Sequence, residues 1–181
     1  MESTCGDRLH RSFADSTEEL YEAISSAFAR GGNVIIPTFA LERAQEILYV
    51  LHQGVERSRL PPAAQVFLDS PMAILATEIF QRHSECLDPD TVRMFRQGAD
   101  PLHVDNLHLA RETADSIAIN RITGGAIIMA GSGMCTRGRI RHHLTAKPVA
   151  KRISDHLRRL CRIGHTRTAN HRWSPLCAAV R

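Results

Sequence analysis

Gly125-Ala-Ile-Ile-Met-Ala-Gly131 is the stretch that decides the fold class of this chain. The residues between its two glycines are all apolar, so the strand that they predict must be covered on both faces. Strands of this kind are typical of parallel sheets, which lie between two layers of helices. The stretch therefore indicates an α/β fold, and the chain then turns from Gly131 into a helix expected from about Gly138.

The rest of the chain repeats this alternation of strand and helix. Short apolar strands are expected at 33–39, at 65–69 and within 102–110. The helices are predicted to start at a capping box at Ser16–Glu19, at about Leu41, at the caps Ser70-Pro71 and Asp88-Pro89, and at Thr113. We therefore expect a mostly parallel sheet with helices on both faces.

The composition is that of an ordinary globular protein. The chain has 181 residues, of which 43% are hydrophobic and 23% charged, and this excludes a mostly disordered chain and a coiled coil. No run approaches the ~18 apolar residues of a transmembrane helix, and the first residues lack the apolar core of a signal peptide. The five cysteines form no C-x-x-C pair, so we expect reduced thiols in the cytoplasm and no membrane partner.

The charge of the chain changes at about residue 147. Residues 147–181 contain nine Lys or Arg and one acid, Asp155, and no helical or strand periodicity continues through them. Three interpretations stay open for this segment: translation in a shifted reading frame, a basic interaction tail, or a divergent helix.

Three polar clusters follow the expected strands, at the points where each strand leads into a helix. They are Pro37–Phe39 with Glu42 and Arg43, Asp69–Met72, and Gly131–Met134. Ligands of open α/β sheets bind beyond the carboxyl ends of the strands, so we expect the clusters to line one rim. The alternative is that they are only helix caps and turns.

The turn at Gly131–Gly133 is suited to a phosphate group. Two glycines let backbone N–H groups approach an anion, and the helix that follows adds its positive end. Nucleotide motifs do not fit, because a dinucleotide fingerprint needs glycine at Thr136 and a P-loop needs lysine at Arg139. A small-molecule α/β enzyme is thereby weakened as a hypothesis, and contact with a nucleic-acid phosphate, with Arg139 as the charge, stays open.

Metal ligands and nucleophiles give no clear pattern. His142 and His143 are adjacent on an expected helix, so their side chains diverge by about 100°. Neither H-x-H nor H-E-x-x-H occurs. We therefore expect no zinc bound to this chain by itself, since a zinc site needs about four ligands.

Four motifs in order carry a family resemblance. They are Glu2–His10, Ile36–Leu48, Leu68–Ala73 and Ala130–Ile140. Together they resemble metallo-β-lactamase-fold RNA-processing nucleases of the β-CASP group, among them ribonuclease J and the cleavage-and-polyadenylation endonuclease.

The resemblance implies a two-domain hydrolase. A metallo-β-lactamase domain carries two zinc ions, which activate water for attack on an RNA phosphodiester. A Rossmann-like β-CASP domain is inserted into it and closes over single-stranded RNA, and relatives often form homodimers. Glu2 matches the family's catalytic acid. The RNA-facing candidates are Thr38, Arg43, Ser70, Ser132, Gly133, Met134 and Arg139.

The resemblance also divides the chain. Residues 1–12 are interpreted as a remnant of the metallo-β-lactamase domain with a linker, 13–146 as the β-CASP domain, and 147–181 as the basic tail. The family's H-x-H-x-D-H metal motif belongs upstream of Glu2, and the sheet is expected to be incomplete at its C-terminal end. We therefore expect one half of a zinc-dependent ribonuclease, inactive alone; the alternative is a non-catalytic RNA-binding β-CASP module.

Two residues depart from the family pattern. Cys5 stands where relatives usually have Tyr, and Arg137 where they usually have Gly. Arg137 has two opposite interpretations, since its side chain would either narrow the phosphate turn or add a phosphate contact.

Overall fold

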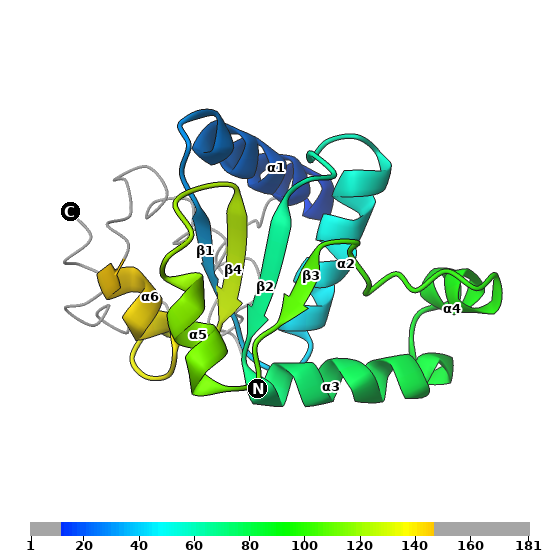
Figure 1. Ribbon diagram of the computed structural model, residues 1–181. Coiled ribbons are helices and arrows are strands. Elements are labelled where there is room, and N and C mark those ends of the chain that lie inside the picture. The colour runs from blue at the N-terminus through cyan, green and yellow to red at the C-terminus, as the bar shows by residue number, and fades with distance from the viewer. Residues whose placement is uncertain (1–11, 147–181) are drawn as a thin grey trace, which may run out of the picture.

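The computed structural model describes residues 12–146, which form one four-stranded sheet surrounded by helices (Figure 1). The strands are β1 (Val34–Pro37), β2 (Gln65–Asp69), β3 (Leu107–Leu109) and β4 (Ala126–Ala130). Their order is β1-β4-β2-β3, and each pair of neighbours is parallel. The predicted α/β fold with a parallel sheet is confirmed.

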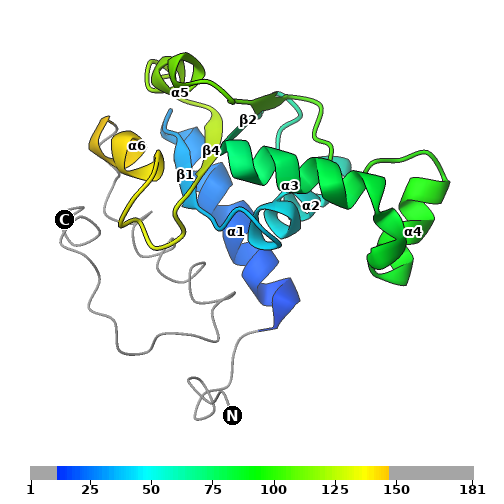
Figure 2. The same ribbon diagram turned by 90° about the horizontal axis from the view of Figure 1, so that it is seen from below.

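Helices cover both faces of this sheet. They are α1 (Phe13–Ala29), α2 (Arg43–Glu56), α3 (Pro71–Arg82), the short 3-10 helix η1 (Ser84–Cys86), α4 (Pro89–Arg96), α5 (Thr113–Ile119) and α6 (Ile140–Ala146). α1 and α2 lie on one face, whereas α5 and α6 lie on the other (Figures 1 and 2). α3 runs along the lower edge in Figure 1 and leads to α4, which projects beyond β3.

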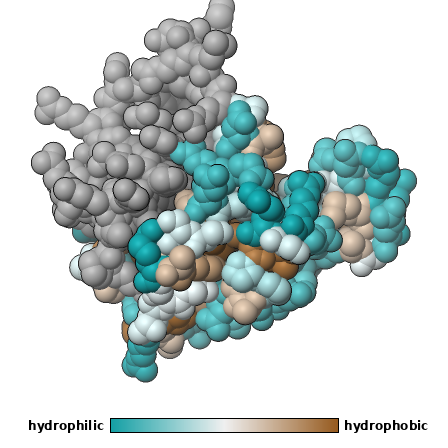
Figure 3. Space-filling view, turned by 90° about the horizontal axis from the view of Figure 1, so that it is seen from above, coloured by the Kyte–Doolittle hydropathy of each residue, from teal (hydrophilic) through white to brown (hydrophobic). Residues whose placement is uncertain are grey.

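The visible surface at the end of the sheet away from α3, where the strands begin, is mainly polar (Figures 1 and 3). Figure 3 shows this end from above, with scattered hydrophobic areas and with the segment around α4 as a separate lobe on the right. No helix within residues 12–146 is both long enough and apolar enough to cross a membrane.

Alternate residues of the strands enter two separate cores. In β1, Val34 and Ile36 pack with α1 and α2, whereas Ile35 packs with α5 and α6. β4 lies in the middle of the sheet and is buried at all of its positions, as its apolar sequence predicted. Burying one Ile or Leu side chain stabilises the folded state by about 1.5–3 kcal/mol, so the two cores hold both helical layers on the sheet.

The helix caps predicted after β2 and before α4 are confirmed. Ser70 Oγ accepts a hydrogen bond from the Ala73 N–H at the start of α3. Asp88 accepts hydrogen bonds from the N–H groups of Asp90 and Thr91 at the start of α4. Both caps are followed by proline, which has no N–H group and so leaves no donor without an acceptor in the first turn.

The predicted start of α1 is wrong by about one turn. The helix begins at Phe13, and the Ser12 hydroxyl accepts a hydrogen bond from the Asp15 N–H. Ser16, the predicted cap, lies inside the helix and donates its hydroxyl hydrogen to the Ser12 carbonyl. Ser12 and Asp15 have the same spacing as Ser16 and Glu19, so local pattern alone favoured neither start.

The predicted buried face of α2 is confirmed except for its first residue, Leu41. Ala44, Leu48 and Leu51 are buried as predicted, but Leu41 is 61% exposed. Glu42 has a φ of 64°, which is incompatible with a right-handed helix, so α2 begins only at Arg43. Leu41 therefore belongs to the loop at the end of β1.

The connections place three loops side by side at one edge of the sheet. The loops after β1 and β2 lead to helices on one face, whereas the loop after β4 leads to α6 on the other. Asp69 and Pro37 both pair with Ala130, so three strands end at the same level. Open α/β sheets bind ligands at the carboxyl ends of their strands, at the point where neighbouring connections lead to opposite faces of the sheet. Figure 2 shows this end of the sheet from below.

Candidate functional site

The structure brings the three polar clusters together at this edge. A Cβ atom added to Gly131 would lie 3.8 Å from the Thr38 carbonyl oxygen and 4.0 Å from Ser70 Oγ. The Thr38 N–H also donates to the Ala130 carbonyl. We call the three segments 38–42, 70–72 (the cap and first residues of α3) and 131–139 the rim.

Two hydroxyl groups of the rim are buried without a hydrogen-bond partner in the described part of the chain. They are Thr38 Oγ1 and Ser132 Oγ. Leaving a buried polar group unpaired costs about 1–3 kcal/mol, and most such groups in proteins are paired. The rim therefore contains two hydroxyl donors that a ligand with acceptor oxygens would satisfy.

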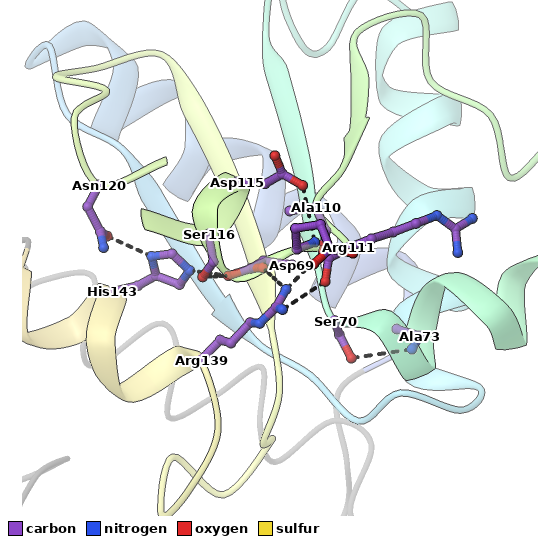
Figure 4. A network of polar contacts seen from close by, with 11 residues as sticks. Asp69, Ser70, Ala73, Ala110, Arg111, Asp115, Ser116, Asn120, Arg139 and His143 are labelled. Carbon is purple, nitrogen blue, oxygen red and sulfur yellow. Dashed lines mark hydrogen bonds and ion pairs between the residues drawn. The ribbon is translucent and has the colours of Figure 1, made fainter. Parts of the chain in front are cut away.

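Ser70 has a structural role, and within residues 12–146 its hydroxyl hydrogen is not used for the cap. Its oxygen accepts the cap hydrogen bond from the Ala73 N–H at 3.3 Å (Figure 4). A serine hydroxyl has one hydrogen to donate in addition to the bonds that it accepts. Ser70 is therefore able to cap α3 and to donate to a ligand at the same time.

The loop 131–139 is closed by its own backbone. The Ser132 N–H donates to the Arg137 carbonyl, and the Ile140 N–H donates to the Gly131 carbonyl. The Ser132 N–H is therefore not open to an anion, and the predicted cradle of N–H groups is wrong at this residue. Its side-chain hydroxyl remains.

Apolar side chains border the same rim. A Cβ atom on Gly133 would come within 2.6 Å of the Phe39 ring, so the ring packs directly on this glycine. Phe39 and Met134 are 36% and 37% exposed, and Met72 is exposed at the start of α3. The rim therefore offers apolar surface beside its hydroxyl groups.

The two predicted phosphate-binding arginines are engaged within the protein. Arg43 forms an ion pair with Glu46 on the first turn of α2. Arg139 donates from Nη1 to Asp69 Oδ1 at 2.7 Å and to the Ala110 carbonyl at 2.9 Å, and from Nη2 to the Arg111 carbonyl at 2.8 Å. Neither guanidinium stands free at the rim, and a phosphate contact by either stays a prediction.

Asp69 is the centre of a buried network that sequence reasoning missed (Figure 4). Its carboxylate accepts hydrogen bonds from Arg139, from Ser116 Oγ at 2.6 Å and from His143 Nε2 at 2.6 Å. Burial raises the pKa of Asp69, but the hydrogen bonds from His143, Ser116 and Arg139 outweigh it and hold the pKa below its ordinary value. Asp69 is therefore a carboxylate at neutral pH.

His143 is wholly buried in this network. Its Nδ1 lies 2.7 Å from Oδ1 of Asn120, the residue after α5, opposite the Nε2 contact with Asp69. The sequence predicted of His143 only that its side chain diverges from that of His142, and it did not predict a contact with Asp69. The signal that was available is the spacing of four residues between Arg139, which directly precedes α6, and His143 in that helix, because side chains four apart lie on one side of a helix turn.

The remaining predictions concern catalysis and metal. Glu2, the predicted catalytic acid, lies outside the described residues. Within 12–146 no three His, Cys, Asp or Glu side chains are grouped so that they could hold a metal ion. These residues therefore do not fit a zinc site, and no chemical step through zinc is derived for them.

Comparison with known proteins points to one family. Residues 44–161 match the family model described as the Beta-Casp domain, and this range includes the start of the basic segment. A ribonuclease of Thermus thermophilus is 41% identical over 143 residues, which cover 79% of this chain and 32% of that protein.

Two further relatives are more distant. A transcription termination factor of Methanosarcina mazei is 32% identical over 139 residues, which cover 73% of this chain and 21% of that protein. An endoribonuclease of Saccharomyces cerevisiae is 28% identical over 146 residues, which cover 76% and 18%. The chain thus spans about a third or less of the curated relatives that it matches.

Proposed function

The chain belongs to the β-CASP family of metallo-β-lactamase-fold nucleases, and from this premise we propose that it forms the RNA-binding half of a ribonuclease active in RNA processing. The observation that carries the proposal is the meeting of Thr38, Ser70 and Ser132 at the carboxyl ends of adjacent strands. Two of the three bring buried hydroxyls without partners in residues 12–146. Phosphate oxygens along single-stranded RNA are acceptors that match such donors.

The rim binds RNA through its hydroxyl groups and its apolar side chains together. Thr38 and Ser132 donate to phosphate oxygens, and Ser70 adds a third donor. Both buried hydroxyls are covered in this structure, so binding requires the loop 131–139 to shift. Phe39 and Met134 then offer surface to bases or ribose, since aromatic contact with bases is a general feature of single-strand binding.

The chemical step belongs to a second domain of a longer protein. That domain has the metallo-β-lactamase fold, holds zinc ions and activates the attacking water. Glu2, which matches the family's catalytic acid, assists proton transfer to the leaving group. The residues of 12–146 bind and orient the RNA, and the present chain alone does not cleave it.

An exposed apolar stripe on α3 fits the second domain. Met72, Leu75 and Ile79 are 72%, 53% and 57% exposed, and their spacing of three and four puts them on one side of the helix. Leu41 is exposed in the neighbouring loop. Contiguous apolar surface of this kind marks an interface, and here the metallo-β-lactamase domain covers it.

RNA binding by the rim is tested by comparing two variants, each of which replaces one serine by aspartate. Ser132→Asp puts a negative charge where phosphate binds and should weaken single-stranded RNA affinity about tenfold, measured by fluorescence anisotropy. Ser25→Asp on the exposed side of α1 adds the same charge far from the rim and serves as the control. Equal affinities for the two variants would contradict the proposal.

The basic segment is removed for this measurement. A chain of residues 1–146 should bind RNA more weakly than the full chain and with a smaller dependence on salt, since each neutralised phosphate on a single strand contributes a slope of roughly −0.7. Binding that vanishes completely without residues 147–181 would assign RNA affinity to that segment and not to the rim.

A further inference from the structure

A largely buried polar cluster adjoins the rim, and the proposed function makes no use of it. It consists of Asp69 at the end of β2, Arg139 at the end of the loop 131–139, and His143 on α6 (Figure 4). The Asp69 and His143 side chains are inaccessible to solvent, and the Arg139 side chain is 22% exposed. Ser116 of α5 and Asn120, which follows that helix, complete the hydrogen bonds of the cluster.

Arg139 ties the loop to two other segments. Its guanidinium joins the Asp69 carboxylate to the Ala110 and Arg111 carbonyls, which lie between β3 and α5. A planar guanidinium holds several acceptors in a fixed arrangement, which a lysine ammonium does not do. The far end of the loop 131–139 is therefore held against β2 and the connection between β3 and α5, while its near end continues from β4.

The cluster connects to the rim through the chain itself. Asp69 directly precedes Ser70, and Arg139 ends the loop that contains Ser132. Ser70 Oγ and the Gly131 backbone are neighbours across the rim, as the short distance from Ser70 to a Cβ on Gly131 shows. We infer that Asp69, Arg139 and His143 are positioning residues, which set the place of Ser132 relative to Ser70 and so the fit of the rim to phosphate; this inference rests on the proposed function.

The competing role for Arg139 is direct contact with a phosphate, and the two roles predict different salt dependence. If Arg139 neutralises a phosphate, Arg139→Gln reduces the salt slope by roughly 0.7. If Arg139 positions the loop, Arg139→Gln weakens RNA affinity about tenfold while the slope stays the same. A slope reduced by this amount would overturn the positioning role.

The direction in which Asp69→Asn changes RNA affinity distinguishes an electrostatic effect from positioning. Asp69→Asn removes a negative charge beside the proposed phosphate site, so electrostatics alone would strengthen RNA binding. Positioning predicts the reverse, a loss of about tenfold. Arg139→Lys keeps the charge but not the three contacts, and it should lose affinity like Arg139→Gln. Tighter binding by Asp69→Asn, or full rescue by Arg139→Lys, would contradict the inference.

The rate of cysteine labelling measures how tightly the loop 131–139 is held, in the absence of RNA. Cys135 is buried in the loop 131–139 and Cys86 is exposed near α4, so each chain carries its own control. Asp69→Asn and Arg139→Gln should speed maleimide labelling of Cys135 about tenfold, with Cys86 unchanged, as followed by peptide mass spectrometry. Unchanged labelling of Cys135 in both variants would show that the cluster does not hold the loop.

RNA affinity tests the proposed function, whereas Cys135 labelling tests the positioning role by itself. The full chain could bind no RNA at the rim while Cys135 becomes more reactive in the variants. The proposed function would then be wrong, but the cluster would still be shown to hold the loop 131–139 in the wild type. If Asp69→Asn does not fold, Ser116→Ala removes one hydrogen bond from the same carboxylate. It should then raise Cys135 labelling by a smaller factor, and no increase at all would count against the inference.

Discussion

Gly138 packs against the carbonyl group of Gly131, so the two ends of the loop 131–139 touch. A Cβ atom on Gly138 would lie 2.9 Å from the Gly131 carbonyl carbon and still closer to its oxygen, and Gly138 has a φ of +81°. Both the backbone conformation and the contact therefore require glycine.

Gly138→Ala should destabilise the protein by about 3 kcal/mol, because left-handed strain and overlap with the backbone add. Gly98→Ala is the matched control, since Gly98 has a φ of +82° but open space around its Cα. It should cost only about 1–2 kcal/mol for the conformation. Urea unfolding of both variants measures the difference, and equal losses would show that the contact with Gly131 relaxes freely.

The ionised form of Asp69 should make stability sensitive to acid. Its hydrogen bonds hold the pKa of Asp69 below the ordinary value in the folded state. The contribution is therefore complete above the ordinary pKa of an aspartic acid, about 3.9, and is lost as the pH falls through the lower folded value. The urea midpoint should fall more steeply in the wild type than in Asp69→Asn from about pH 5 to pH 3.

Asp88→Asn serves as the control for this acid dependence. The pKa of Asp88 is also lowered, chiefly by its hydrogen bond with the Thr91 side chain, but Asp88 is exposed. Asparagine keeps the helix cap without the charge. If Asp88→Asn removes as much of the acid dependence as Asp69→Asn, the buried network is not its source.

Ser70 separates a capping role from a binding role. Ser70→Ala removes the cap of α3 and should cost about 1 kcal/mol of stability. Ser70→Asp keeps a capping oxygen, so its stability should match the wild type, but its charge should weaken RNA binding about tenfold. Thermal melts and RNA titrations on the same samples test both statements, and unchanged RNA affinity of Ser70→Asp would leave Ser70 as a cap only.

The exposed stripe on α3 should cause self-association when the partner domain is absent. Leu75→Glu with Ile79→Lys adds polar groups to exposed positions and should reduce light scattering on storage, with little change in the melting temperature. Ile74→Lys is the contrasting variant, because Ile74 is buried in the core beside the stripe. It should unfold the protein, and scattering unchanged by the double variant would place the association elsewhere.

The purified chain should contain no stoichiometric zinc. The described residues offer no group of three suitable ligands, and catalytic zinc sites need three from the protein. Elemental analysis after dialysis tests this. One or two tightly held zinc ions per chain would show that residues outside 12–146 complete a site.

Local sequence determined the elements and the edge at which the site lies. The apolar residues of β4 predicted a strand covered on both faces, and Ser70 and Asp88 predicted helix starts, because periodicity and caps depend on neighbours along the chain. The parallel arrangement then predicted that the loops carrying Thr38, Ser70 and Ser132 meet, since all parallel strands end on the same side.

The tertiary structure alone decided what the charged side chains do. Asp69 and His143 are separated by 74 residues, and their contact depends on β4 lying beside β2, an order that no local pattern encodes. Sequence reasoning therefore assigned Arg139 to an external phosphate, whereas packing turns it towards an internal carboxylate. Long-range pairing determines which charges are neutralised inside the protein, and only the remaining donors are left for a ligand.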